Sequence, residues 1–302
     1  MNGVGSRVSA WVPSRQAGTT LPPVVAFATG IALLFAAGAG WRNAWRWWQR
    51  LDGSSRALLT AAAVVGVFLL TTVIMLLLPA LTRVYAGSWG RRGPGGRLRA
   101  AATRRERGRL ERLQAVDTDR SYWRRYFTFP PTPGEVRPTR LGNVLGAAEA
   151  YPGDEQRYGL DAVFFWPRLY PLLPDGLQAS LAAARATMET LLLFSALALV
   201  FAATAVAAGS AAAVSPAVAA IGAVAGLLVS PVTYRLAVRA GWDYGELVRA
   251  SFDVYRRDLL AAMGFPLPGT LEEEREVWQA VGQQLYRRGA NEPDWVRLRP
   301  DP

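Results

Sequence analysis

The sequence contains no cysteine, no histidine and no lysine, so all of its positive charge comes from arginine. These absences remove the usual ligands of zinc, haem and iron–sulfur centres, thiol nucleophiles, Ser-His-type catalysis and the lysine of phosphate-binding loops. We therefore expect neither a cofactor nor a metal ion. The lack of cysteine leaves the redox compartment open.

Charge is also missing from several long apolar stretches. No charged side chain occurs in Ala57–Leu81, Leu191–Ala208 or Val214–Tyr234, and a shorter apolar run extends from Pro22 to Gly40. About 20 apolar residues at ~1.5 Å rise cross a hydrocarbon core of ~30 Å. The sequence thus predicts an all-α membrane protein with four transmembrane helices in two hairpins, and with long helices that extend into a cytoplasmic helical domain.

The first apolar run has two interpretations. The motif Ala37-Gly38-Ala39 resembles a signal-peptidase site, which would make the run a cleaved signal peptide. We favour a retained helix, because a long polar segment precedes it and a helical pattern follows it, with Pro22 and Pro23 in its first turn. The expected organisation is a mobile tail over 1–20, a transmembrane hairpin over 21–83, a basic and proline-rich cytoplasmic segment over 84–174, a second hairpin with cytoplasmic extensions over 175–263, and a cytoplasmic helix and tail over 264–302.

Residues 41–51 predict an amphipathic helix at the membrane surface. Tryptophans recur at helical spacing and arginines occupy the adjoining stripe, so that rings would sit among lipid headgroups and guanidinium groups would face phosphates. An aromatic belt that anchors the first span is favoured over a specific lipid or partner contact. The predicted membrane-interface residues are Trp41, Arg42, Trp45, Arg46 and Trp48.

Leu160–Pro174 is too short and too rich in proline to cross a bilayer. We interpret it as an interfacial or buried segment, with a re-entrant gate as the alternative. Its predicted membrane-interface residues are Trp166, Arg168 and Tyr170.

Arginines interleaved with aromatic residues at 122–127 are compatible with nucleic-acid binding, since guanidinium groups bind phosphate and rings stack on bases. Their position after a span favours attraction to anionic lipid headgroups instead, and we expect no nucleic-acid partner.

Small residues and helix caps mark the second hairpin and its extensions. Gly222 and Gly226 form a GxxxG motif that allows close helix packing in lipid, and Pro231 predicts a kink. Expected N-terminal caps are Ser54 or Ser55, Thr139, Asp175, Ser215 and a capping box over Thr270–Glu273.

Beyond the fourth span, an apolar stripe predicts one buried face, formed by Tyr244, Val248, Ser251, Tyr255 and Leu259. Charged pairs at helical spacing predict an exposed face of the same helix, formed by Glu246–Arg249, Arg249–Asp253 and Asp253–Arg257.

No charged side chain lies within the expected spans, which disfavours proton-coupled transport. The remaining carboxylate groups have structural explanations, because Asp154 and Glu155 lie in a turn and Glu272–Glu274 would complement a helix dipole. We expect no enzymatic activity.

Arg83 and Arg239 flank the second and fourth spans on the side of the 82–186 segment, so the positive-inside rule places that segment and both termini in the cytoplasm. Four arginines within 42–56 argue for the opposite orientation.

Three phrases, at 138–149, 157–169 and 244–260, resemble a family of four-span bacterial membrane proteins that is seen especially in actinobacteria. The resemblance covers roughly residues 138–288. It implies a bacterial inner-membrane protein and transfers no catalytic residue, because that family has no assigned activity.

These patterns together favour a non-enzymatic membrane protein whose cytoplasmic helical layer docks a protein partner or a second copy. Apolar helix faces that continue past the membrane motivate this hypothesis, although the two faces could also bury each other. The alternative is an oligomeric channel or pore subunit lined by small and hydroxyl residues of the third and fourth spans.

Overall fold

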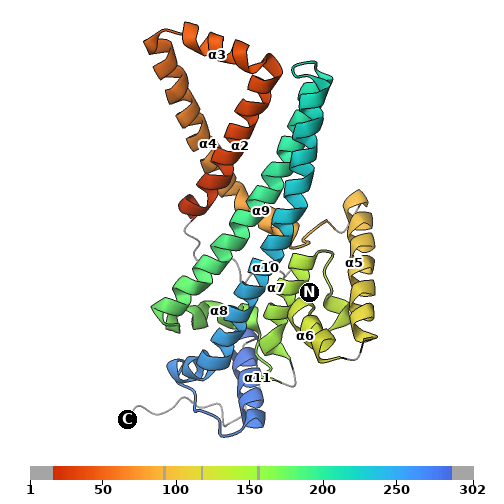
Figure 1. The fold of residues 1–302 in the computed structure, drawn as a ribbon. Coiled ribbons are helices and arrows are strands. Elements are labelled where there is room, and N and C mark those ends of the chain that lie inside the picture. Colours follow the sequence, from red (N-terminus) through yellow and green to blue (C-terminus); the bar gives the residue numbers. More distant parts are fainter. Residues whose placement is uncertain (1–15, 91–92, 117, 155–156, 288–302) are drawn as a thin grey trace. The chain divides into compact units, whose positions relative to one another are not determined.

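The computed structural model describes residues 16–90, 93–116, 118–154 and 157–287 (Figure 1). Within these residues every regular element is a helix, which confirms the predicted all-α class. The elements are α2 Gln16–Ala39, α3 Trp41–Arg50, α4 Gly53–Tyr85, α5 Gly93–Gln114, α6 Asp119–Thr128, η1 Pro133–Glu135, α7 Arg140–Ala150, η2 Tyr151–Gly153, α8 Ala162–Leu169, η3 Tyr170–Leu172, α9 Asp175–Ser210, α10 Pro216–Ala262 and α11 Leu271–Arg287.

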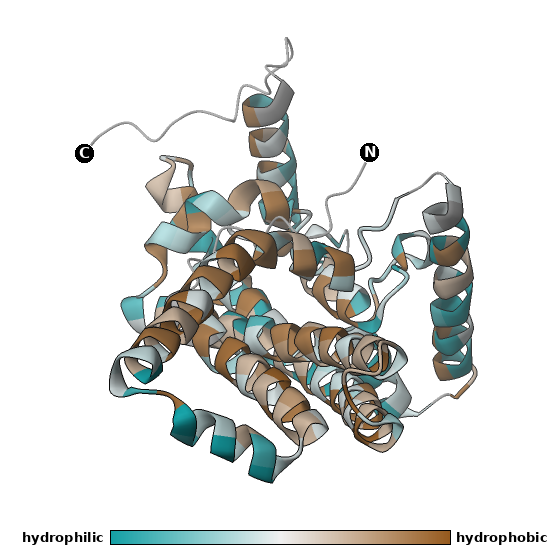
Figure 2. Ribbon diagram, turned by 90° about the horizontal axis from the view of Figure 1, so that it is seen from above, coloured by the Kyte–Doolittle hydropathy of each residue, from teal (hydrophilic) through white to brown (hydrophobic). Residues whose placement is uncertain are grey.

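Four of these helices are long and apolar enough to cross a membrane. They are α2 from Thr20 onward, α4, α9 and α10, and hydrophobic residues predominate in long helices of Figure 2. This agrees with the four predicted spans. Most of the predicted N-terminal tail and the segment after Arg287 lie outside the described residues.

Two expectations about helix beginnings were wrong. Helix α2 starts at Gln16, so Pro22 and Pro23 lie inside it rather than in its first turn. Helix α4 is capped by Asp52 rather than by Ser54 or Ser55, because the Asp52 carboxylate accepts hydrogen bonds from the Ser54 hydroxyl and, at 3.3 Å, from the Ser55 backbone N–H. The hydrogen bond from Ser54 contributes most, and together these bonds lower the pKa of Asp52 to about 2.

The other caps follow local side-chain chemistry. Thr139 accepts from the Gly142 N–H at 3.0 Å, and Ser215 accepts from the Val218 N–H at 3.3 Å. The box at α11 also forms, since Thr270 Oγ1 accepts from the Glu273 N–H at 3.2 Å. A third expectation was also wrong: Asp175 lies inside the first turn of α9 rather than at its cap, and the Pro174 carbonyl accepts from the Leu177 and Gln178 N–H groups.

The chain divides into two compact units. Within the described residues, the first unit consists of 83–185 and 240–287, and the second unit consists of 16–82 and 186–239. Helices α9 and α10 contribute residues to both units.

Close contacts between small residues hold the second unit together. A Cβ atom added at Gly226 of α10 would lie 2.8 Å from Ala202 Cβ of α9 and closer still to the Ala198 carbonyl oxygen. One added at Gly222 would lie 3.0 Å from Ala205 Cβ and 3.2 Å from Leu34 Cδ1 of α2. Gly226 therefore lets α10 approach the backbone of α9, and Gly222 leaves room for side chains of α9 and α2.

Helix α4 joins this packing around Ile74, which forms a buried cluster with Val24 of α2 and Leu193 of α9. Toward α3, α2 and α4 diverge (Figure 1), and apolar side chains of α4 are exposed, with Leu58 at 72% and Phe68 at 68%. Pro231 lies inside α10, which continues to Ala262.

The core of the first unit forms where α7, α8 and α11 pack on the C-terminal part of α10. Trp166 of α8 is fully buried, with its ring 5.6 Å from that of Phe252 on α10. Phe165 packs edge-on against Trp278 of α11 at 5.0 Å. The predicted apolar stripe of α10 is confirmed at four positions, since Tyr244, Val248, Ser251 and Leu259 are all buried.

We predict that Gly226→Ala destabilises the protein by about 1–3 kcal/mol through overpacking, although alanine has the higher helix propensity. The matched control is Gly66→Ala on α4, where an added Cβ would meet no atom within 4 Å. Thermal unfolding of the full-length protein in detergent measures both. Equal midpoints for the two variants would contradict the packing described for Gly226.

Candidate functional site

A cluster of arginine, tyrosine and aspartate side chains occupies the face of α10 that was predicted to be exposed. Arg249 is only 5% exposed, and its guanidinium carbon lies 4.9 Å from the ring centroid of Tyr126 and 5.2 Å from that of Phe127, both on α6. Its Nη2 also donates to the Tyr126 carbonyl at 3.3 Å, and its Nη1 pairs with Glu246. The expected Glu246–Arg249 pair therefore forms, but its arginine is buried under α6.

Asp253, one turn further along α10, binds tyrosines rather than the predicted arginines. Its two carboxylate oxygens accept from Tyr151 at 3.0 Å and from Tyr158 at 2.9 Å. Burial, assisted by these hydrogen bonds, raises the pKa of both phenols, so each stays protonated and keeps donating at neutral pH. The expected Arg249–Asp253 and Asp253–Arg257 pairs were wrong, and Arg257 donates to the Pro268 carbonyl at 3.2 Å.

Two further arginines close the cluster. Arg157 lies over the Tyr151 ring at 4.2 Å from its centroid and donates to the Tyr151 hydroxyl at 2.9 Å. Arg256 lies 3.9 Å from the Tyr158 ring centroid and pairs with Glu274 of α11, with Nε 2.7 Å from Oε1. The cluster thus ties α6, Tyr151, Tyr158 and α11 to one side of α10.

Glu274 was assigned only to the helix dipole of α11, and this interpretation was incomplete. Its side chain is 2% exposed and also accepts from Trp278 Nε1 at 3.4 Å. The Glu149 side chain is 9% exposed, with Oε2 2.7 Å from Arg137 Nη2. Burial raises the pKa of the Glu149 carboxyl, and Arg137 acts in the opposite direction.

The three predicted interface residues of segment 160–174 differ in their burial. Trp166 belongs to the core of the first unit, so the buried interpretation holds for this side chain and the interfacial one does not. Arg168 is exposed and Tyr170 half-buried. Arg168 Nη1 donates to the Phe164 carbonyl at 2.8 Å, and its guanidinium carbon lies 4.2 Å from that ring's centroid.

The predicted interface helix at 41–51 is α3, and none of its residues is buried. Trp41 and Trp45 are 60% and 62% exposed, Trp48 is half-buried, and Arg42 and Arg46 are exposed. The helix thus presents its rings and guanidinium groups to its surroundings.

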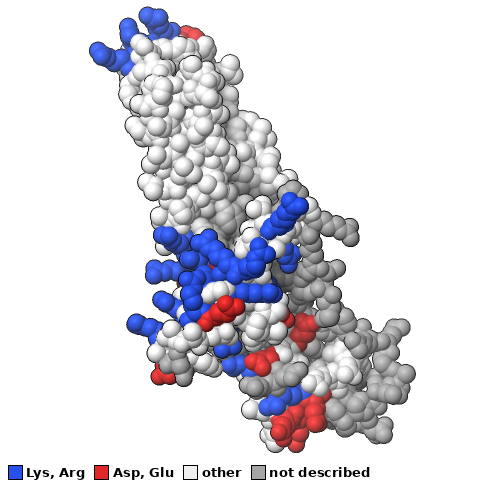
Figure 3. Space-filling view, turned by 90° about the vertical axis from the view of Figure 1, so that its right-hand side faces the viewer, with Lys and Arg blue, Asp and Glu red and all other residues white. Residues whose placement is uncertain are grey.

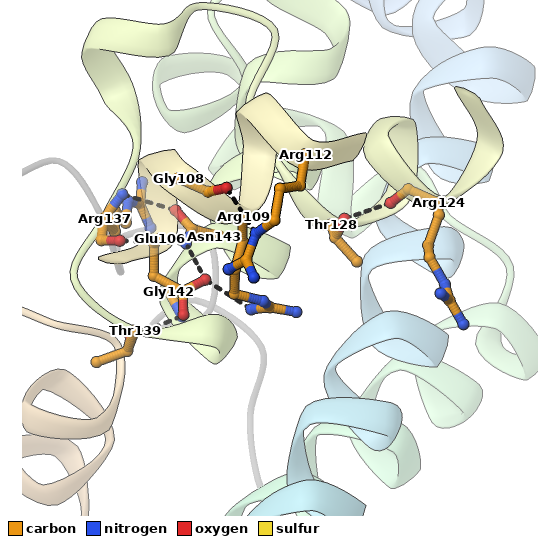
Figure 4. Close-up of polar contacts among 10 residues, drawn as sticks. All are labelled: Glu106, Gly108, Arg109, Arg112, Arg124, Thr128, Arg137, Thr139, Gly142 and Asn143. Atoms are coloured by element: carbon orange, nitrogen blue, oxygen red, sulfur yellow. Dashed lines mark hydrogen bonds and ion pairs between the residues drawn. The ribbon is translucent and has the colours of Figure 1, made fainter. Parts of the chain in front are cut away.

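A buried polar network fixes α5 to α7 (Figure 4). Glu106 of α5 is 6% exposed and pairs with Arg109 at 2.8 Å, while Asn143 Nδ2 of α7 donates to it at 3.4 Å. Asn143 is itself fixed by Arg137, whose backbone N–H donates to it at 2.6 Å. The face of α5 that carries Glu106 and Leu110 is therefore turned inward.

The other sides of α5 are strongly basic. Figure 3 shows arginine side chains gathered over α5 and α6 on the face drawn. A groove of about 510 Å³ runs beside α5 and is lined by Arg99, Thr103, Arg104 and Arg107 of α5, by Gly134 of η1 and by Val136 directly after η1.

The acidic side chains of the first unit that form these contacts have structural roles. Asp253, Glu106, Glu149 and Glu274 each accept hydrogen bonds from protein groups, so they serve as structural acceptors. Within the described ranges, no three acidic side chains lie close enough to hold a metal ion.

No protein family model matches the chain, and comparisons with curated proteins and with solved structures find no match. The resemblance to four-span actinobacterial proteins stays a prediction.

We predict that Asp253→Asn lowers the stability of the protein by about 2 kcal/mol, because two tyrosine donors lose their charged acceptor. At roughly 2–4 °C per kcal/mol, this shifts the unfolding midpoint by roughly 4–8 °C. Asp258→Asn is the control, since Asp258 is exposed on the same helix. Thermal unfolding in detergent should separate the two variants, and a midpoint unchanged by Asp253→Asn would rule out the cluster as a stabilising element.

Proposed function

We propose that this chain is a non-enzymatic integral membrane protein whose first unit is a cytoplasmic binding module for a protein partner or a second copy. Four apolar helices support the membrane location, and the resemblance supports a bacterial inner membrane. In this proposal α2 and α4 form one transmembrane hairpin, and α9 and α10 form the other. The packing of α2 against α9 and α10 favours a retained first helix.

The observation that carries the docking role is the exposed surface of α6. Tyr122 and Trp123 are 60% and 53% exposed, and Arg124 beside them is exposed as well. Tyrosine, tryptophan and arginine are the residues that contribute most often to protein–protein binding energy. The apolar faces of α9 and α10 were the original reason to expect a partner. On those faces Leu181 and Met188 of α9 and Tyr244, Val248 and Leu259 of α10 are buried, so they leave docking to α6.

The α6 surface is also preorganised. Trp123 stacks on Phe127 at 5.9 Å between ring centroids, and Phe127 in turn lies under the Arg249 guanidinium. A partner would therefore meet aromatic side chains whose backbone is already fixed, which reduces the entropic cost of binding.

A pore lined by the third and fourth spans has less support. Ser195 of α9 is buried and donates to the Ser230 carbonyl of α10 at 3.0 Å, and the Gly222–Gly226 face packs against α9. These small and hydroxyl residues are used in helix packing, so they do not provide a channel wall within one chain.

The docking role can be tested with a photo-cross-linking amino acid in place of Trp123 in the native membrane. We expect a discrete adduct, either at twice the mass of the chain or at the mass of a partner. Val254, which is 62% exposed on α10, provides the control position. Adducts with lipid alone at position 123, or adducts of equal yield at both positions, would overturn the proposal.

The orientation can be tested by single-cysteine labelling, because the chain has no cysteine of its own. Ser210 at the end of α9 and Ser88 after α4 are both exposed. If the first unit is cytoplasmic, a membrane-impermeant maleimide labels Ser210→Cys in intact cells and labels Ser88→Cys only after lysis. The reverse pattern would place the first unit outside.

A further inference from the structure

The groove beside α5 has the composition of an anion site. Three of its lining residues are arginines, a fourth is the half-buried Thr103, and none of the described lining residues is acidic. Glu106, the carboxylate of the same helical turns, is buried toward α7 and held by Arg109 and Asn143. Its charge is therefore turned away from the groove and compensated by Arg109, whereas the exposed Glu135 lies between the lining residues Gly134 and Val136.

The spacing along α5 aligns these groups. Arg99, Thr103 and Arg107 follow one another at intervals of four residues, so they share one helix face, and Arg104 adjoins it. Arg99 donates one N–H to the Trp89 carbonyl at 3.2 Å, which fixes that guanidinium at one end of the groove. Arg104 and Arg107 are exposed and stand at the other end.

We propose that this groove binds a phosphate group, held by the Arg104 and Arg107 guanidiniums and the Thr103 hydroxyl. A guanidinium donates two parallel hydrogen bonds to phosphate oxygens, which makes it the side chain of choice for this anion. The inference rests on the proposed binding role of the first unit and names one ligand class for it. The phosphate can belong to the headgroup of an anionic phospholipid or to a free phosphate compound.

Two features favour a phosphate compound over single-stranded RNA. Sites for single-stranded nucleic acid combine a basic groove with aromatic rings on which bases stack. The described lining of this groove contains no aromatic residue, and the exposed Tyr122 and Trp123 belong to α6. The volume, about 510 Å³, is that of a small-ligand pocket rather than of a flat polyanion track.

The test compares full-length protein with Arg104→Gln/Arg107→Gln and with the control Arg105→Gln/Arg112→Gln. The control arginines are exposed on the same helix, lie outside the groove lining, and remove the same charge. Native mass spectrometry in detergent measures the binding of phosphatidylglycerol, with phosphatidylcholine as a lipid of no net charge. We expect the groove variant to lose on the order of tenfold in phosphatidylglycerol affinity, which corresponds to ~1.4 kcal/mol, and the control to keep most of it.

Excess inorganic phosphate distinguishes the sources. If it displaces the lipid from wild type, the site takes free phosphate compounds as well; if it does not, the ligand is a lipid headgroup. Both results support a phosphate-binding site in the groove. Equal loss in both variants would reveal diffuse charge attraction and overturn the proposal, as would binding of a labelled single-stranded RNA in preference to both phosphate probes.

The same variants separate this inference from the docking role. If the Trp123 cross-link persists in the groove variant while its lipid affinity equals that of wild type, the phosphate site is refuted and the docking surface stands. If the cross-link is absent from wild type while the groove variant still loses lipid, the docking surface is refuted and the groove stands.

Discussion

The burial of Arg249 beneath α6 is the interaction on which the first unit depends. A buried guanidinium is costly unless its charge is compensated, and here two aromatic faces, the Tyr126 carbonyl and Glu246 provide that compensation. Because those groups come from α6 as well as α10, α6 must stay in place for Arg249 to remain buried. One turn away, Asp253 imposes the same condition on Tyr151 and Tyr158, whose hydroxyl groups donate to its carboxylate.

The helices of the second unit are positioned by a different kind of contact. Its helices have few polar groups with which to specify their contacts, so steric fit at Gly222, Gly226 and Gly30 determines where they approach. One buried hydroxyl contact, between Ser195 and Ser230, adds a directional bond between α9 and α10. The two units therefore differ as their compositions require: charge and aromatic contacts position α6 in one, and small-residue packing positions α10 in the other.

Features that depend on neighbouring residues could be predicted from the sequence. The four apolar helices follow from uncharged length, and the Thr139, Ser215 and Thr270 caps follow from side chains three residues from the amides they bind. Asp253 could not be assigned in this way, because its tyrosine partners lie 102 and 95 positions away. Charge spacing predicted an exposed face for Arg249, since spacing along one helix does not show which other helix covers it. The aromatic run at 122–127 is the available signal, because its half-buried residues Tyr126 and Phe127 cover the Arg249 guanidinium.

The central claim is that the first unit is a preformed module, with α6 fixed before any partner binds. Hydrogen–deuterium exchange on the full-length protein in detergent tests this most directly, because amide protection reports local opening. We predict that the amides of α6 exchange slowly, in the same range as those of the buried helix α7. If α6 exchanged at the rate of an unstructured peptide while α7 stayed protected, Arg249 would not hold it and the docking surface would not be preorganised.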